Sequence, residues 1–349
     1  MKKLFLGSSA FIVVATLFAC GGGGGGSTGP AGFQQTYTAS AAQGELISYA
    51  VDTKNLTYSY TVIKSQYGCE VVSNACHSGS GSLTKNSDSS YSTTGSSDKI
   101  YALQSGLLVG TIKLGNMPAT PLIGIPNPIS TSSSLAGVYN FISAQCAQKT
   151  QGAMTGCQGM YGSLSVVDAG TNTVTYTTCE SDDIENPARS CASSTSGTGS
   201  YDSTLNAWKF SRNGSSNENY MVAFTSTNGQ KVAYLDFNDA GGYGYGQATM
   251  SQRFTAQQSD LPAAAGQWFF VNLTPGQDST THIETVNQDG TVSSNGGVLT
   301  LNTPMNGFAV NSLDNRGKLI MAGSGVLTFG GYTNNSGDAK YMFATRISP

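Results

Sequence analysis

Charged side chains are scarce in this chain of 349 residues: Asp, Glu, Lys and Arg make up 11% of it, and the formal net charge is −3. Globular proteins average about 25% charged residues. Polarity comes here from Ser, Thr, Asn, Gln and Gly instead. The chain has no cluster of Lys or Arg, which a nucleic-acid-binding surface requires. We therefore expect no nucleic-acid partner.

Long hydrophobic runs and helical periodicity are also missing from the body of the chain. After residue 20, no segment approaches the ~18 consecutive apolar residues of a transmembrane helix. Short β-prone runs are separated by Gly, Asn and Ser instead. This pattern predicts an all-β fold of tandem small antiparallel β-barrel or β-sandwich modules, each built from consecutive meander hairpins.

The N-terminal segment carries the most informative local pattern. Lys2 and Lys3 precede an apolar run from Leu4 to Phe18, which is too short for a bilayer span and typical of a secretory signal. The run ends in Leu17-Phe18-Ala19-Cys20, and six glycines follow. This ending resembles the lipobox of bacterial lipoproteins, although Phe18 is larger than the residue usual at its position.

The resemblance implies cleavage before Cys20, a diacylglycerol on its sulfur, and acylation of the new α-amine with a fatty acid such as palmitate. Two or more acyl chains hold a protein stably on a bilayer. The Gly-rich residues 21–32 then form a flexible tether. In Gram-negative lipoproteins an aspartate after the cysteine causes retention, and Gly21 stands there instead. The resemblance therefore implies an outer-membrane lipid anchor, with the body facing either the periplasm or the medium.

The cysteine count predicts disulfides. Seven cysteines minus Cys20 leave six, an even number in an exported chain. Zinc binding would need a C-x-x-C motif or a Cys/His cluster, and neither occurs. Among the possible connectivities, short sequence separation favours three local pairs: Cys69–Cys76, Cys146–Cys157 and Cys179–Cys191.

Three segments open alike, each with Ala-Gly and a nearby aromatic residue: Ala31-Gly32-Phe33, Ala136-Gly137-Val138-Tyr139 and Ala265-Gly266-Gln267-Trp268. A hairpin pattern follows each, over residues 47–61, 164–178 and 283–294. In the first two copies a Gly-Ser-Ser triplet starts six residues before Tyr101 and Tyr220. The shared order predicts a diverged repeat. In it, Tyr101 and Tyr220 occupy equivalent strands, and Tyr139 and Trp268 have equivalent depths.

The repeat sets the predicted domain boundaries. Four of the ten prolines fall within residues 117–134, which we interpret as a semi-rigid extended spacer and not a central strand. The predicted segments are a signal peptide (1–19), the lipidated cysteine and tether (20–32), β module 1 (33–116), a Pro/Ser-rich linker (117–134), β module 2 (135–256), a linker (257–265) and β module 3 (266–349).

Candidate catalytic groups are few. His77 adjoins Cys76, and His282 begins a predicted strand with no acid or cysteine in motif spacing. The formal G-x-S-x-G at 25–29 lies in the tether, where no strand-to-helix elbow can form. Two acid-bearing stretches lack calcium-loop spacing, and we interpret both as solvated polar loops: Glu180, Asp182, Asp183 and Glu185, and then the oxygen-rich segment with Asp236 and Asp239. We predict no catalytic site, no metal and no cofactor.

The Gly241–Gly246 segment, GGYGYG, is unusual because small residues flank two tyrosines. Exposed tyrosine rings with hydroxyl groups suit sugars or protein partners, so Tyr243 and Tyr245 are candidate binding residues. The alternative is a bent strand with glycine kinks.

Three functional hypotheses follow. The favoured one is a non-enzymatic envelope lipoprotein whose tandem β modules bind, adhere to or display a glycan or protein partner. The second is a barrel-type carrier of a small apolar ligand, which requires an internal cavity. The third is an envelope hydrolase, which requires converging acids or a serine–histidine contact.

Overall fold

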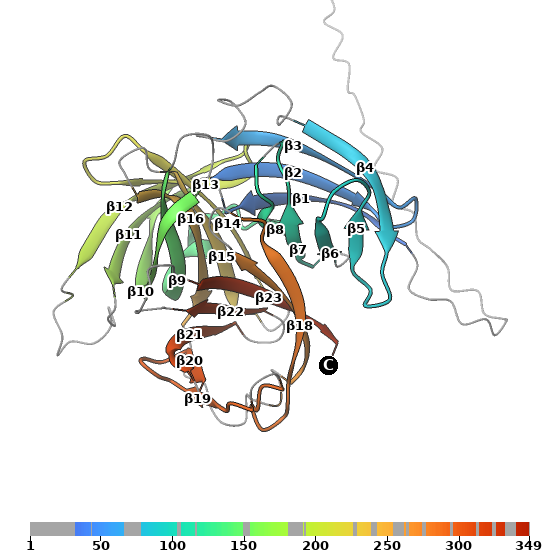
Figure 1. The fold of residues 1–349 in the computed structure, drawn as a ribbon. Coiled ribbons are helices and arrows are strands. Elements are labelled where there is room, and N and C mark those ends of the chain that lie inside the picture. The colour runs from blue at the N-terminus through green and yellow to red at the C-terminus, as the bar shows by residue number, and fades with distance from the viewer. Residues whose placement is uncertain are drawn as a thin grey trace, which may run out of the picture. The chain divides into compact units, whose positions relative to one another are not determined.

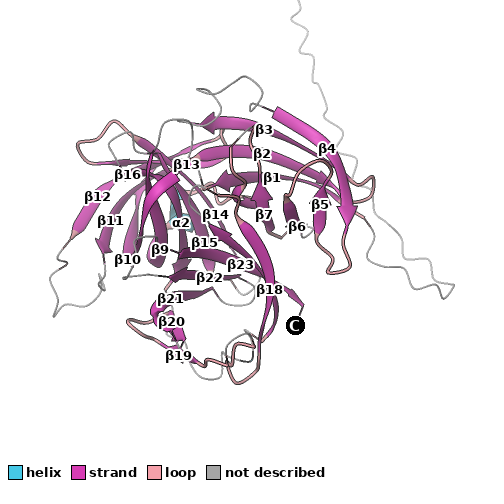
Figure 2. Cartoon of the chain, viewed as in Figure 1, coloured by secondary structure: helices cyan, strands magenta, loops and turns pink. Residues whose placement is uncertain are grey.

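A computed structural model describes the following residues: 32–42, 44–65, 78–102, 106–115, 117–148, 154–180, 191, 193–225, 229–238, 243–253, 262, 265–273, 277–293, 296–311, 314–322, 326–331 and 340–348. The chain divides into residues 1–31 and a compact unit, Gly32–Pro349, which contains every described strand. Figure 2 shows that this unit is built almost entirely of strands. No helix among the described residues has the length and apolarity to cross a membrane.

The first eight strands form a closed antiparallel barrel, blue to teal in Figure 1. Its hairpins follow the predicted pattern: in the turn between β2 and β3, the Asp52 carboxylate accepts hydrogen bonds from the backbone N–H groups of Lys54 and Asn55. The strands are β1 (Gln34–Ala41), β2 (Glu45–Asp52), β3 (Thr57–Ser65), β4 (Ser78–Lys85), β5 (Tyr91–Thr93), β6 (Lys99–Ala102), β7 (Leu108–Ile112) and β8 (Thr120–Ile125).

The next eight strands form a second closed barrel with the same order, in which the first strand pairs with the last. A short helix, α2 (Ser132–Leu135), precedes it. The strands are β9 (Gly137–Gln148), β10 (Met154–Gly170), β11 (Thr173–Glu180), β12 (Ser194–Asp202), β13 (Ala207–Arg212), β14 (Glu218–Thr225), β15 (Lys231–Asn238) and β16 (Tyr243–Gln252).

The two barrels confirm the predicted repeat for its first two copies, whereas the third predicted copy forms a seven-stranded sheet. Tyr101 and Tyr220 lie on β6 and β14, the sixth strand of each barrel, and both belong to one buried cluster. A second shared feature is a Gly-x-Gly on the fourth strand. Gly79 and Gly81 leave room for the rings of Tyr60 and Tyr58, and a Cβ on Gly197 would lie 2.7 Å from the Tyr176 ring.

The third unit is a seven-stranded sheet whose edges are β18 and β19. Trp268 on its opening strand is 1% exposed, the same as Tyr139 on the opening strand of the second barrel, so the predicted equivalence of depth is confirmed. In sheet order the strands are β18 (Thr280–Val286), β17 (Gly266–Leu273), β23 (Lys340–Ser348), β22 (Val326–Gly331), β21 (Asp314–Ala322), β20 (Phe308–Asn311) and β19 (Leu299–Leu301).

The predicted linker 117–134 is wrong as a spacer, because β8 lies inside it and closes the first barrel. Every residue of β8 is buried. Pro121 is tolerated because it lies next to the strand's start, opposite Thr111 of β7 and before the β1 pairing begins at Leu122. The burial of Leu122, Ile123 and Ile125 outweighs the signal of the surrounding prolines.

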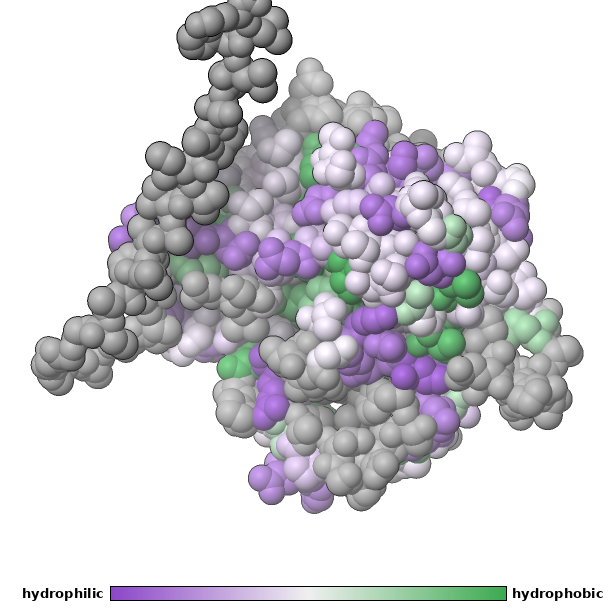
Figure 3. Space-filling view, turned by 180° about the vertical axis from the view of Figure 1, so that it is seen from behind, coloured by the Kyte–Doolittle hydropathy of each residue, from purple (hydrophilic) through white to green (hydrophobic). Residues whose placement is uncertain are grey.

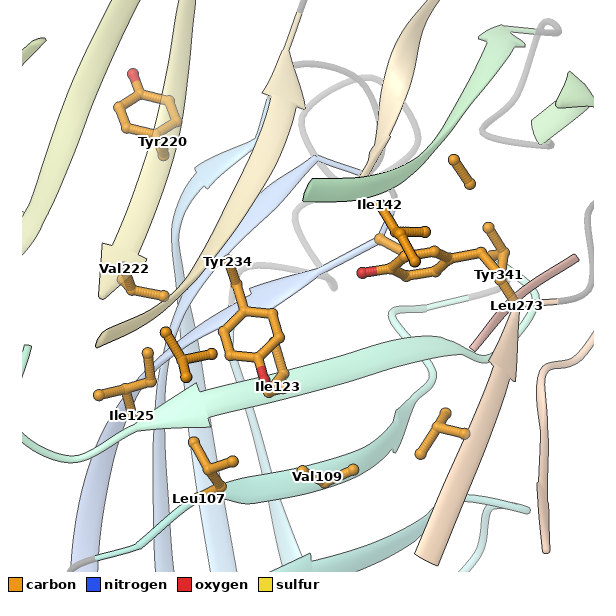
Figure 4. Close-up of a cluster of buried hydrophobic side chains, with 14 of the residues drawn as sticks. Leu107, Val109, Ile123, Ile125, Ile142, Tyr220, Val222, Tyr234, Leu273 and Tyr341 are labelled. Carbon is orange, nitrogen blue, oxygen red and sulfur yellow. The ribbon is translucent and has the colours of Figure 1, made fainter. Parts of the chain in front are cut away.

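Each barrel has its own core, and a third cluster joins the modules. Alternate residues of one strand belong to a barrel core and to this joining cluster. On β6, Ile100 and Ala102 belong to the first-barrel core, while Tyr101 belongs to the joining cluster. This junction core, shown in Figure 4, includes Val109 and Ile123 of the first barrel, Val222 and Tyr234 of the second, and Leu273 and Tyr341 of the third sheet. Because the outward faces of the barrels are apolar where they meet, the three modules share buried surface.

Candidate functional site

The described surface offers no large apolar patch. The exposed large hydrophobic residues among the described ones come from four separate segments: Leu56, Val167, Ile283 and Val298. On the face that Figure 3 shows, hydrophobic residues occur in small groups among polar ones. Isolated apolar residues are normal on a protein surface. The concentrated apolar surface that could take a ligand lies inside the second barrel.

A cavity of about 210 Å³ occupies the interior of the second barrel. Inward-facing side chains of seven strands form its apolar lining: Phe141, Met160, Leu164, Tyr176, Phe210, Met221, Leu235, Phe237, Ala248 and Met250. Methionine side chains adapt to irregular shapes and contact aromatic groups favourably, so three of them give this lining plasticity. An engineered apolar cavity of about 150 Å³ holds benzene, and this cavity is larger.

One end of the second barrel is closed by the segment that precedes it. Leu135 of α2 and Ile129 pack against the barrel core. The Trp208 indole N–H donates a hydrogen bond of 2.7 Å to the Ile129 carbonyl, and the Tyr139 hydroxyl donates one to the Leu135 carbonyl. Because these aromatic groups have their polar atoms paired, they form a stable floor. Part of the predicted linker is therefore the floor of the second barrel.

The opposite end of the cavity carries its polar lining: Gln145, Thr178, Glu180, Thr195, Arg212, Ser215, Asn217 and Asn219. Arg212 is exposed, so the cavity reaches solvent there. The Cys179–Cys191 disulfide stands at this end, since Cys179 precedes Glu180 at the end of β11. The strand β16 begins at the same end, where Tyr245 pairs with Cys146.

The interior of the first barrel is packed differently, although its strand order is the same. Tyr49 stacks on Tyr58 and Tyr60 with ring centroids 5.9 and 6.2 Å apart. Tyr49 belongs to the first-barrel core, and the other two rings pack against it. Three stacked tyrosines thus fill part of the interior of the first barrel.

Two buried carboxyl groups lie near the contact between the barrels. The Gln247 amide donates to the Ser40 hydroxyl at 2.8 Å, and this hydroxyl donates to Asp236 Oδ1. Burial raises the pKa of Asp236 well above its ordinary value, against the lowering effect of Ser40, and nearby Glu45 raises it further. Burial also raises the pKa of Glu45 from 4.5 to about 8. Burial therefore disfavours the charged form of both groups, and Glu45 is held as a neutral acid at neutral pH.

The environment of these acids gives a physical reason for their protonation. No described group hydrogen-bonds either carboxyl oxygen of Glu45, Asp236 Oδ2 or Gln247 Oε1. Gln247 lies opposite Asp236 in the β15–β16 register. A proton on Asp236 Oδ2 converts an acceptor into a donor that the Gln247 carbonyl can accept. Asp236 was expected in an oxygen-rich polar loop; it lies buried in a strand instead.

Of the predicted disulfides, the structure describes one in full. Cys179 and Cys191 form a disulfide with Cα atoms 5.5 Å apart, the pair that its short loop favours. Cys146 is also disulfide-bonded. The backbone of Cys157 belongs to β10, but its side chain lies outside the described residues, as do Cys69 and Cys76. Cys20, the predicted lipidation site, lies outside them too.

The remaining candidates separate into described and undescribed groups. The ring of His282 stacks on Phe270 at 5.1 Å, and its Nδ1 lies 3.2 Å from the Asn272 amide nitrogen, which gives this histidine a packing role on β18. Glu180 accepts a hydrogen bond from Ser193 at 3.1 Å and lines the cavity. The candidates outside the described side chains are His77, Asp182, Asp183, Glu185, Asp239, Tyr243 and Tyr245.

The cavity residues themselves were not singled out in the sequence. Their only signal is the alternation of the strands, which places Met221, Met250 and Phe210 inside but does not say whether they fill the barrel. Within the described part of the chain, no group of three or more His, Cys, Asp or Glu side chains could hold a metal ion.

Comparisons with known proteins give only weak likenesses. No family model and no curated protein matches the chain. A Nostoc punctiforme protein of unknown function from the DUF3598 family is 10% identical, with a TM-score of 0.21 over 91% of this chain and 96% of that one. A double mutant of transferrin binding protein B from Haemophilus parasuis is 10% identical, with a TM-score of 0.20 over 90% of this chain and 66% of that one. Scores this low carry no argument about function.

Proposed function

We propose that this protein is a lipid-anchored, non-enzymatic binding protein of the cell envelope whose second barrel holds a small apolar ligand. The observation that carries the proposal is the 210 Å³ apolar cavity, closed at one end by Leu135 and Trp208 and reaching solvent at the other. Ligand pockets share this form: a concave apolar interior with a few polar groups at one side. Of the non-enzymatic hypotheses, carriage of an apolar ligand is the one that this cavity favours.

The size of the cavity limits the ligand. Drug-sized ligands occupy about 300–1,000 Å³. A cavity of 210 Å³ therefore suits a single ring system or a short alkyl chain, whose end can extend through the polar mouth. Binding would bury apolar ligand surface at about 25 cal/mol per Å², which is the driving force that we infer.

Filling the cavity tests this function. Ala248 is fully buried and lines the cavity, so Ala248→Leu places three more carbons inside it. We expect octanol to bind the soluble body, residues 32–349, and Ala248→Leu to weaken that binding by about tenfold or more, because the added atoms occupy the ligand's space. Isothermal titration calorimetry with octanol measures it.

Ala50→Leu is the matched control, because Ala50 is half-buried on β2 of the first barrel and makes the same change in side chain away from the cavity. It should bind octanol like the wild type. Absence of octanol binding to the wild-type body, or equal binding by Ala248→Leu, would refute the cavity as the binding site. Thermal unfolding of both variants separates lost binding from lost fold.

The anchor is tested independently at Cys20. Because only the cysteine sulfur can carry the diacylglycerol, Cys20→Ser should abolish incorporation of an alkyne fatty acid and leave an uncleaved precursor at the inner membrane. In-gel detection of the label measures this. Equal labelling of wild type and variant would contradict the lipid anchor in the outer membrane.

A further inference from the structure

The two charged groups at the mouth of the cavity lie on the same wall, Glu180 on β11 and Arg212 on β13. The amide-bearing residues of the lining are Gln145 on β9, Asn217 just before β14 and Asn219 on β14. Across the barrel, β10, β15 and β16 present Met160, Phe237 and Ala248. A ligand in the cavity therefore meets both charged groups of the lining along the wall of β11 and β13, and mainly apolar groups across the barrel.

Arg212 is the charge closest to the apolar interior. The register places it opposite Gly197 of β12, which in turn lies opposite Tyr176 of β11, so Arg212 and Tyr176 share one level of the barrel. Gly197 has no side chain to separate them. Burial raises the pKa of Tyr176, and the Arg212 guanidinium lowers it, which reports their proximity. Phe210, two residues before Arg212, lines the apolar part.

The acidic group at the mouth lies further out and is engaged elsewhere. Glu180 is four residues beyond Tyr176 on β11, about 13 Å along a strand. It accepts a hydrogen bond from Ser193. Within the described residues no ion pair of Arg212 is found, whereas Lys209 on the outer face of the same strand pairs with Asp202 and Glu218. Arg212 is thus the inner cation of the site, with its guanidinium available to a ligand.

We infer that the ligand is an amphiphile with a single anionic head group, such as a carboxylate, which Arg212 holds at the mouth while the apolar part fills the cavity. The inference rests on the proposed function. A guanidinium binds a carboxylate through two parallel hydrogen bonds, which fixes the position of the head group. The apolar chain then points toward Phe210 and Met221 in the interior.

Octanoate and octanol form a matched pair of probes, because they share the alkyl chain and differ in the charge of the head group. We expect the body 32–349 to bind octanoate more tightly than octanol, measured by calorimetry near neutral pH. Arg212→Gln should weaken the binding of octanoate by about three- to tenfold and leave the binding of octanol unchanged. The substitution removes a charge-assisted hydrogen bond to the head group of octanoate, and octanol makes no such bond. Raising the salt concentration should reduce the octanoate preference.

Lys209→Gln is the matched control, since it removes a positive charge from the same strand but from the outer face. It should leave both affinities unchanged. Suppose that octanol binds, and that Arg212→Gln weakens the binding of both probes equally or of neither. The head-group role of Arg212 is then refuted, while the apolar cavity remains the binding site. If neither probe binds the wild-type body, the proposed function itself fails.

Discussion

Replacing Glu45 with Gln is expected to raise the free energy of unfolding at neutral pH. The measure is the difference between variant and wild type, which should be larger at neutral pH than in acid. Glu45 is completely buried, and both its carboxyl oxygens lack a hydrogen-bond partner among the described residues. Its pKa is about 8 in the folded protein against an ordinary 4.5. Gln has nearly the same shape as the neutral acid and never ionises.

The sign follows from proton linkage. Because the folded pKa is raised, the folded state keeps a proton that the unfolded state loses between about pH 4.5 and pH 8. The contribution of Glu45 to stability is therefore complete below pH 4.5 and declines as pH rises toward 8. At pH 7 the loss is about 3 kcal/mol, from 1.36 kcal/mol per pKa unit. Asp236, whose pKa is also raised by burial, adds to the decline in the same direction.

Urea unfolding at several pH values, followed by tryptophan fluorescence, measures this. The free energy of unfolding of Glu45→Gln minus that of the wild type should grow by about 3 kcal/mol between about pH 4 and pH 7. Glu218→Gln is the control, because the Glu218 side chain is 42% exposed. Its difference in the free energy of unfolding from the wild type should not grow in the same way. Parallel pH curves for wild type and Glu45→Gln would show that Glu45 is not held as a neutral acid.

Truncating Phe269 to Ala should destabilise the protein by about 3–5 kcal/mol, the range for a buried aromatic residue. Phe269 is 1% exposed and belongs to the junction core. Its ring stacks on Tyr101 of the first barrel with centroids 6.0 Å apart, and Lys99 Nζ lies 5.8 Å from its centroid. The substitution therefore removes packing between the third sheet and the first barrel.

A double-mutant cycle isolates that contact. Tyr101→Ala and Phe269→Ala should show a coupling energy of about 0.5–1.5 kcal/mol in the free energy of unfolding, as aromatic pairs do. Phe270 offers the matched control: it is the same residue type on the same strand, but it packs in the separate core of the third sheet. Tyr101→Ala and Phe270→Ala should be additive. Additivity of Tyr101 with Phe269 would contradict a shared junction core.

The fold class follows from the sequence because strand alternation and turn residues are local signals. The repeat placed Tyr101 and Tyr220 on equivalent strands, since Gly-Ser-Ser spacing survives in both copies. The linker was misjudged at β8, where the prolines suggested a spacer but Leu122 and Ile123 are buried through pairing with β1 and β7. The pairing with β1 joins residues far apart in sequence, so no local pattern announces it.

The sequence predicts which residues of the candidate site point inward, but it does not predict the cavity. Alternation on β13 and β14 predicts that Phe210 and Met221 point inward, but it does not distinguish a filled interior from a cavity. The difference between the barrels depends on volumes summed over eight strands, with three tyrosines stacked in the first. The burial of Glu45 and Asp236 likewise depends on the docking of two barrels. Such sums over distant strands cannot be read from one stretch of sequence.

Methionine-methyl NMR during an octanol titration tests the central claim most directly. Three methionines line the cavity of the second barrel: Met160, Met221 and Met250. Met117 lies in the core of the first barrel and Met305 in the junction core, so they serve as internal references. We predict saturable shifts of the three cavity methyl signals and unchanged reference signals. Unshifted cavity signals at octanol saturation, or shifts centred on Met117, would contradict a ligand site in the second barrel.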